Sequence, residues 1–134
     1  MRIAIVGGGA IGGWIAARLA LAGADPLLLV RPGREVDRLT LHEGGAGRSV
    51  AIRSIAEASG EGSQEAVLIA VKAYQFAEAA EAAAPLIGPG TLVVPLVNGV
   101  PWWFADPPLS SVDPDGRIAA ALPTGQVIGS VVHA

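Results

Sequence analysis

The stretch from Met1 to Gly23, MRIAIVGGGAIGGWIAARLALAG, constrains the fold more than any other part of the chain. Arg2 to Val6 is a short apolar run rich in β-branched residues, which is typical of a parallel strand covered on both faces. The glycines at positions 7 to 9 interrupt this run, and from Ile11 apolar residues recur at helical spacing until Gly23. The stretch therefore predicts a strand, a tight glycine turn and a helix.

Within this turn, Gly7, Gly9 and Gly12 satisfy the pattern G-x-G-x-x-G. Gly7 permits the sharp turn, Gly9 lets the backbone approach a pyrophosphate without a Cβ in the way, and Gly12 lets the helix lie close to the strand. The free N–H groups at the helix start, around Ala10 and Ile11, then face the phosphates. Because the motif follows a strand and opens a helix, it predicts a dinucleotide-binding site. The alternative is a glycine-rich turn without a ligand.

Length and composition narrow the class of protein. The chain has 134 residues, enough for one domain with a core, and its 51% hydrophobic content with 18 glycines and few aromatics suits packed α/β layers. No apolar run reaches the length of about 20 residues that a membrane span requires, and Arg18 argues against a signal peptide. The absence of cysteine excludes disulfides and thiolate metal sites, and a net charge of −3 with scattered arginines gives no reason to expect nucleic acid. We therefore expect a cytoplasmic protein without membrane or nucleic-acid partners.

The second core strand is expected at Pro26 to Val30, and it ends at Arg31. In dinucleotide sites the residue at this strand tip, about 20 residues beyond the glycine motif, lies beside the adenosine ribose. An acid there binds the 2′-OH of NAD, whereas an arginine pairs with the 2′-phosphate of NADP. The nearest acid, Glu35, follows only after a turn, so the sequence favours NADP, with Arg34 as a weaker second candidate. The alternative for Arg31 is a solvated side chain that ends a strand.

A small hairpin is expected after this strand. Val36 to Leu41 could form a short helix or enter a strand, and residues 44–47 form a flexible turn. Ser49 to Ile55 alternates enough to pair with Leu39 to Glu43, as a decoration outside the central sheet. His42 has no second metal ligand nearby, and we expect it to face solvent.

Two further buried strands are expected to end in polar residues. Ala66 to Val71 is followed by Lys72 and an alanine-rich helix, and Thr91 to Val97 is followed by Asn98. Ligands of doubly wound sheets bind outside the carboxyl ends of the strands, where a lysine can meet a phosphate or a carboxylate. Taken alone, the lysine could be a surface residue and the Asn-Gly pair an ordinary turn. Because Arg31 ends a third such strand, we expect these three side chains to line one cleft.

The last third of the chain begins with an unusual aromatic segment, Pro101-Trp102-Trp103-Phe104. Packing in the core beneath the sheet edge is favoured slightly over a surface that meets a substrate or another domain. Asp106 to Gly116 predicts a loop, Ile118 to Leu122 a short helix and Val127 to His133 a final strand, with His133 in a structural position. The whole pattern predicts an α/β fold with a doubly wound parallel sheet, a Rossmann NAD(P)-binding domain with a small hairpin insertion.

These segments resemble the N-terminal NADP-binding domain of the ketopantoate reductases (2-dehydropantoate 2-reductases). The resemblance covers essentially the whole chain and rests on the glycine turn, VLIAVKAYQ around Lys72, LVVPLVNGV around Asn98 and VIGSVVH at the end. It implies the following cofactor-binding residues: Gly7, Gly9, Ala10, Ile11, Gly12, Arg31, Lys72 and Asn98. The glycines would cradle the pyrophosphate of NADPH, and Arg31 and Lys72 would hold its 2′-phosphate side. Asn98 would lie near the nicotinamide ribose and the substrate, which makes it the implied catalytic residue.

The resemblance also implies an oxidoreductase of pantothenate biosynthesis that passes a hydride from NADPH to ketopantoate or another 2-oxo acid. Members of that family are longer and carry a second, helical domain with a catalytic lysine and an acidic substrate-binding residue. We therefore expect residues 1–134 to bind NADPH with little or no turnover, and to form a homodimer through exposed apolar surface. The aromatic segment departs from the biosynthetic enzymes and suggests another 2-oxo acid. The alternative is a stand-alone, non-catalytic NADP(H)-binding or sensing module.

Overall fold

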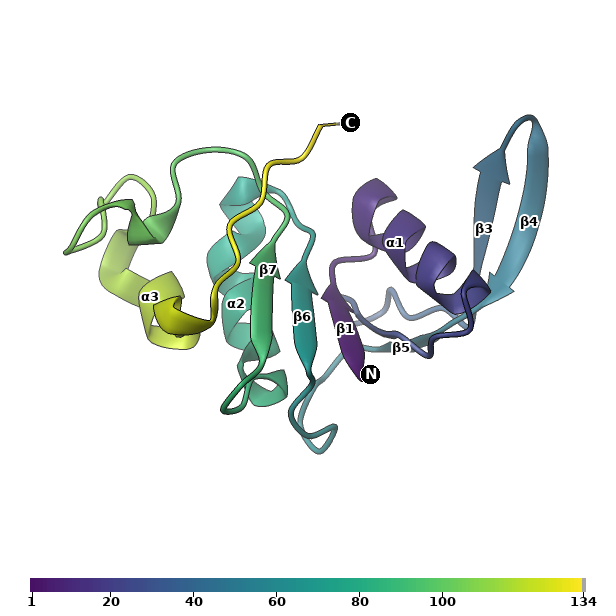
Figure 1. The fold of residues 1–134 in the computed structure, drawn as a ribbon, viewed down its shortest axis with the longest axis horizontal. Helices are drawn as coiled ribbons and strands as arrows, with labels where there is room; N and C mark the ends of the chain where they lie inside the picture. Colours follow the sequence, from purple (N-terminus) through teal and green to yellow (C-terminus); the bar gives the residue numbers. More distant parts are fainter. Residues whose placement is uncertain (134) are drawn as a thin grey trace.

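The computed structural model describes residues 1–133, in which five parallel strands form one sheet in the order β5-β2-β1-β6-β7 (Figure 1). The strands are β1 (Ile3–Val6), β2 (Leu27–Leu29), β5 (Arg53–Ile55), β6 (Ala66–Ile69) and β7 (Leu92–Pro95). Since all four pairings are parallel, every strand ends at the same edge of the sheet. After β1, the chain adds β2 and β5 on one side of it, and then adds β6 and β7 on the other side. The strand order therefore reverses between β1 and β6, where such sheets bind ligands.

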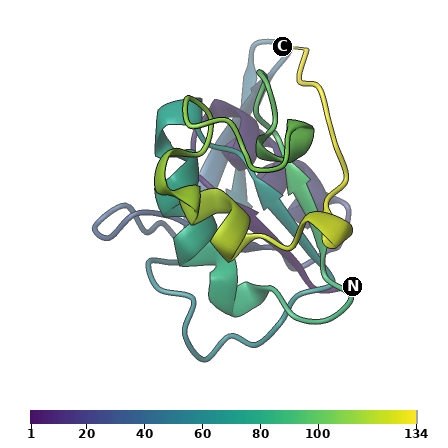
Figure 2. The same cartoon turned by 90° about the vertical axis from the view of Figure 1, so that its left-hand side faces the viewer.

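Helices cover both faces of the sheet (Figures 1 and 2). Helix α1 (Ala10–Leu21) lies on one face, and α2 (Phe76–Ala83) and α3 (Arg117–Ala121) lie on the other. Alternate side chains of a strand point to opposite faces, so Ile5 packs with α1 whereas Val6 joins the cluster around α2. This arrangement confirms the predicted doubly wound fold.

Short 3-10 helices connect these elements, at Ala73–Gln75, Ala84–Leu86, Trp102–Phe104, Pro114–Gly116 and Thr124–Gln126. The segment over Val36 to Leu41 enters a strand and not a helix. None of the helices described between residues 1 and 133 has the length and apolar character that a membrane crossing requires.

The predicted hairpin is formed by β3 (Arg38–Glu43) and β4 (Ala46–Ala51), which pair antiparallel. It stands beyond α1 at the right of Figure 1, and Leu41 and Val50 pack against Ala17 of that helix. His42 is exposed, as expected. The hairpin therefore packs in the same layer as α1 and connects β2 to β5, where a helix would otherwise connect two parallel strands.

The expectation that Ser49 to Ile55 lies wholly outside the central sheet is wrong. Its last residues, Arg53–Ile55, form β5 and pair in parallel with Leu27–Leu29. Between the two strands, Ile52 is buried with Leu28 and anchors the chain to the sheet. No glycine, proline or other turn residue lies between Ala51 and Arg53, so the sequence did not separate the hairpin strand from the sheet strand.

The final strand predicted at Val127 to His133 is also wrong. Val127 forms a single bridge with Val93, and the Ile128 N–H donates to the Val93 carbonyl over 2.8 Å. A parallel ladder would next need the N–H of Pro95, which proline lacks. The Ser130 hydroxyl donates to the Pro95 carbonyl instead. The segment thus runs alongside β7 (yellow in Figure 1), held largely by side chains.

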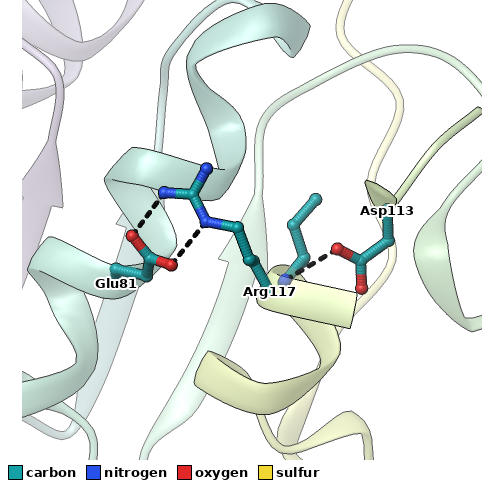
Figure 3. A network of polar contacts seen from close by, with 4 residues as sticks. Glu81, Asp113 and Arg117 are labelled. Atoms are coloured by element: carbon teal, nitrogen blue, oxygen red, sulfur yellow. Dashed lines mark hydrogen bonds and ion pairs between the residues drawn. The ribbon is translucent and has the colours of Figure 1, made fainter. Parts of the chain in front are cut away.

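Helix α3 is fastened to α2 by an ion pair (Figure 3). The Arg117 guanidinium donates from Nε and Nη2 to the two carboxylate oxygens of Glu81, over 2.7 and 2.6 Å. These hydrogen bonds hold the pKa of Glu81 below its usual range and raise that of Arg117. Buried Asp113 caps α3 by accepting from the N–H groups of Ile118 and Ala119. The helix is therefore fixed at its start despite its short length.

Candidate functional site

The glycine turn after β1 leaves no room for a side chain at two positions. Gly7 has a φ of +103°, and a Cβ there would lie 2.5 Å from the carbonyl oxygen of Ala70, directly after β6. A Cβ at Gly12 would lie 1.9 Å from the carbonyl oxygen of Gly7. Both distances are far below van der Waals contact, so these glycines bring β1, α1 and β6 together.

Gly9 differs from both, because a Cβ there would meet no atom within 4 Å. It is the N-cap of α1, no side chain caps this helix start, and no acid occupies the first turn. The helix ladder begins with the Gly13 N–H, which donates to the Gly9 carbonyl over 2.8 Å. The N–H groups before it, including those of Ala10 and Ile11, have no partner within the helix. An open helix start with free N–H groups fits the phosphates of a dinucleotide.

Arg31 and Arg34 flank one tight turn after β2. The Arg34 N–H donates to the Arg31 carbonyl over 3.0 Å, and Gly33 between them has a φ of +78°. Both side chains are exposed, and neither guanidinium pairs with a carboxylate within residues 1–133. Two adjacent cations without an acidic partner suit an anionic ligand group.

Ser54 of β5 holds the loop that carries these arginines, and the sequence did not indicate it. Its hydroxyl accepts from the Val36 N–H over 2.7 Å and donates to the Val36 carbonyl over 2.6 Å. The Ile52 N–H donates to the Asp37 carbonyl one step further on. A lone serine in a strand carries no sequence signal for such a contact, because its partner is set by the tertiary fold.

Lys72 and Asn98 follow β6 and β7, so they stand at the same edge as Arg31. Lys72 is exposed, directly before the 3-10 helix at 73–75. Asn98 is engaged with the backbone of Val132: its Nδ2 donates to the carbonyl and its Oδ1 accepts from the N–H, both over 2.8 Å. Asn98 therefore fixes the segment that runs beside β7.

An apolar cavity of about 360 Å³ lies at the carboxyl end of β7. Asn98 lines it, whereas Arg31 and Lys72 do not. The structure thus brings the three predicted residues to one edge of the sheet but not into one cavity.

The aromatic segment forms one wall of this cavity. Trp102 is buried, with its ring 5.6 Å from that of Phe76 and edge-on to Trp103 at 4.5 Å. The slightly favoured expectation of core packing is confirmed for Trp102, whereas Phe104 is 71% exposed. Within the described residues, no group of three or more His, Asp and Glu side chains could hold a metal ion.

A sequence model of the family described as ketopantoate reductase PanE/ApbA matches residues 3–133. The chain belongs to the ketopantoate reductase family. The resemblance inferred from the glycine turn, VKAYQ and NGV is therefore confirmed.

Individual relatives agree with this family. The 2-dehydropantoate 2-reductase of Mesorhizobium japonicum is 39% identical, over 99% of this chain and 45% of the relative. A crystal structure of a protein assigned as a ketopantoate reductase from Ralstonia solanacearum is 47% identical with a TM-score of 0.90, over 98% of this chain and 44% of that one. The chain thus spans less than half the length of these ketopantoate reductase relatives.

The fold extends to a more distant structure. A D-mandelate dehydrogenase in a ternary structure with NADH and anilino(oxo)acetate has a TM-score of 0.77 at 20% identity, over 98% of this chain and 40% of that one. At this identity the likeness concerns the fold alone.

Proposed function

We propose that the chain is the NADP(H)-binding part of a ketopantoate-reductase-like oxidoreductase. The whole protein would reduce ketopantoate, or another 2-oxo acid, to the 2-hydroxy acid. The observation that carries the proposal is the helix start at Gly9, which is open to a ligand while Gly7 and Gly12 are closed by packing. When bound, NADPH supplies the hydride for the C2 carbonyl of the substrate.

The backbone around Gly7, Gly9 and Gly12 would cradle the pyrophosphate, with N–H groups of Ala10 and Ile11 aimed at its oxygens. Positive charge for the 2′-phosphate would come from Arg31 and Lys72. Arg31 has no carboxylate partner within residues 1–133 and lies at the tip of β2, and both observations support this assignment.

Asn98 is proposed to lie near the nicotinamide ribose and the substrate. Because both polar atoms of its amide bond to Val132, part of its contribution is to position the segment beside β7. In this role Asn98 would keep the backbone around Val132 beside the proposed substrate position.

Residues 1–134 are proposed to supply the cofactor half of the reaction, with a helical domain supplying the proton-donating lysine. The lengths of the relatives support this division. Alone, the chain would bind NADPH with little or no turnover. It would also form a homodimer through exposed apolar side chains such as Phe104 and Val131, which are 71% and 72% exposed. A cytoplasmic location stays a prediction from the sequence, and no observation favours the non-catalytic module.

Calorimetric titration with NADPH and NADH, on wild type, Arg31→Ala and Arg48→Ala, tests the cofactor assignment. Arg48 is an exposed arginine on β4 and serves as the matched control. Wild type and Arg48→Ala should bind NADPH more tightly than NADH, and Arg31→Ala should lose the preference. If neither nucleotide binds wild type, the proposal is wrong. An unchanged preference in Arg31→Ala would overturn the role of that residue.

A further inference from the structure

The proposed cofactor binding leaves the apolar cavity beside Asn98 unexplained. It is lined by the chain around Trp102 and Trp103, by Phe76 of α2 and Ile118 of α3, and by residues 129–131. In doubly wound sheets ligands bind outside the carboxyl ends of the strands. The cavity follows β7 and therefore lies where a second ligand, beside the cofactor, would sit.

The walls of the cavity are held in place by contacts within the chain. Ile118 lies on α3, which the Arg117–Glu81 ion pair ties to α2 and which Asp113 caps (Figure 3). Residues 129–131 are held through Ser130 and Val132. A ligand would thus enter a cavity that already exists, so little binding free energy would be lost to ordering.

The lining offers no charge to a ligand. Among the described residues that line the cavity, none has an ionisable side chain, and the polar side chains Asn98 and Ser130 are already bonded to the backbone of Val132 and Pro95. A carboxylate placed inside would lose its hydration without a counter-charge. The part of a ligand that enters must therefore be uncharged and mainly apolar.

Two observations favour an aromatic group. Rings of Phe76, Trp102 and Trp103 line the space, and such rings pack well against another ring face or edge. A cavity of about 150 Å³ is enough for benzene, so about 360 Å³ holds a phenyl side chain whereas a methyl group would leave most of it empty.

We infer that this cavity holds the side chain of the 2-oxo acid substrate and selects acids with an aromatic side chain over small ones. The inference rests on the proposed function, since it places the substrate's oxo-acid end outside the cavity, on the Asn98 side. Specificity would then reside in the aromatic segment, while the glycine turn binds the cofactor.

The three tryptophans give a direct readout. Indole N–H signals of the ¹⁵N-labelled chain, assigned with single Trp→Phe variants, are followed by NMR with saturating NADP⁺ while phenylpyruvate or pyruvate is added. Trp14 is 51% exposed on α1, away from the cavity, and acts as an internal control. Phenylpyruvate should shift the Trp102 and Trp103 signals saturably, with at least tenfold higher affinity than pyruvate, and leave Trp14 unmoved.

A matched pair of variants locates the binding. Val100 is 51% exposed at the cavity, and Leu92 is 47% exposed on β7 but outside the lining. Val100→Phe should weaken phenylpyruvate binding at least tenfold, and Leu92→Phe should leave it unchanged. Equal binding of both acids, unmoved Trp102 and Trp103 signals, or an unaffected Val100→Phe would overturn the inference.

Failure of the proposed function is seen separately in the same sample. NADP⁺ should shift the backbone amides of Gly9 and Ala10 before any acid is added. If these amides do not move, the cofactor assignment fails and the inference falls with it. If they move but phenylpyruvate has no effect on the indoles, only the inference fails.

Discussion

The two sides of the carboxyl edge are built by different means. Around β1, the geometry depends on atoms that are missing, since a Cβ at Gly12 would lie 1.9 Å from the Gly7 carbonyl oxygen. Around β7, it depends on side chains: Asn98 holds Val132, and Arg117 ties α3 to α2. No other residue can replace glycine where a Cβ does not fit. On the β7 side, several hydrogen bonds together hold the structure, so the loss of one leaves the others in place. Single substitutions should therefore damage the β1 side abruptly and the β7 side by degrees.

The largest effect is expected from Gly12→Ala. The added methyl must push α1 away from the turn, which should lower the free energy of unfolding by at least about 2 kcal/mol. Gly13→Ala is the matched control on the same helix, because its Cβ would lie 3.6 Å from the Gly8 carbonyl oxygen. That variant should be neutral or more stable by up to about 1 kcal/mol. Urea unfolding measures both, and equal stability of the two variants would break the comparison.

Asn98→Ala should have a smaller effect on the β7 side. It removes both hydrogen bonds to Val132, which should lower the free energy of unfolding by about 1–2 kcal/mol. Hydrogen exchange at the Val132 amide reports on the contact itself and should become much faster. Asn98→Asp keeps the acceptor for that amide and should protect it in part. If the Val132 amide exchanges at the wild-type rate in Asn98→Ala, the holding role of Asn98 is refuted.

Ser54→Ala tests a side-chain contact on the cofactor side of the sheet, where the geometry otherwise depends on glycines. Without the hydroxyl the Val36 contact is lost, and the loop with Arg31 should loosen. The preference for NADPH over NADH should fall about fivefold, or about 1 kcal/mol, because only part of the stabilisation from the two lost hydrogen bonds is transmitted to Arg31. Calorimetry should show unchanged NADH affinity, and Ser54→Thr should restore the preference. A fall in affinity for both nucleotides alike would argue against a specific effect on Arg31.

The smallest effect is expected from Glu81→Gln, at acid pH. Arg117 lowers the pKa of Glu81 in the folded chain, so the ion pair contributes its full stabilisation above the usual carboxyl range and loses it as the pH falls through the lowered pKa. Wild type should therefore lose stability on acidification more steeply than Glu81→Gln. Thermal unfolding between neutral and acid pH measures this, and parallel curves would show that the exposed pair contributes nothing.

The sequence predicted the β1 side well because its rules are local. A strand, a glycine turn and a helix follow from backbone sterics within a few residues, and the position of Arg31 follows from its spacing to the glycine motif. Strand ends at Lys72 and Asn98 were also predicted, since buried parallel strands read as continuous apolar runs.

The β7 side was predicted less well because its contacts join residues far apart in the chain. Asn98 bonds to Val132 through surroundings that no local pattern encodes. The same limit applies to Ser54 on the cofactor side, which bonds to Val36. The prediction of a final strand was wrong because Pro95 has no N–H to donate, and this matters only once the partner segment is known. Trp102 was expected in the core, but the cavity beside it is lined by several segments that lie far apart in the chain.

The most direct test of the account is the effect of Gly9→Ser on stability and on NADPH affinity. Serine is a good N-cap and its side chain would enter open space, so the free energy of unfolding should stay level or rise by a few tenths of a kcal/mol, roughly. The same side chain would occupy the approach of the pyrophosphate, so NADPH affinity should fall at least tenfold. Gly125→Ser, also in open space but away from the turn, is the control and should bind as wild type does. Wild-type NADPH affinity in Gly9→Ser would contradict the central claim that this helix start is the cofactor site.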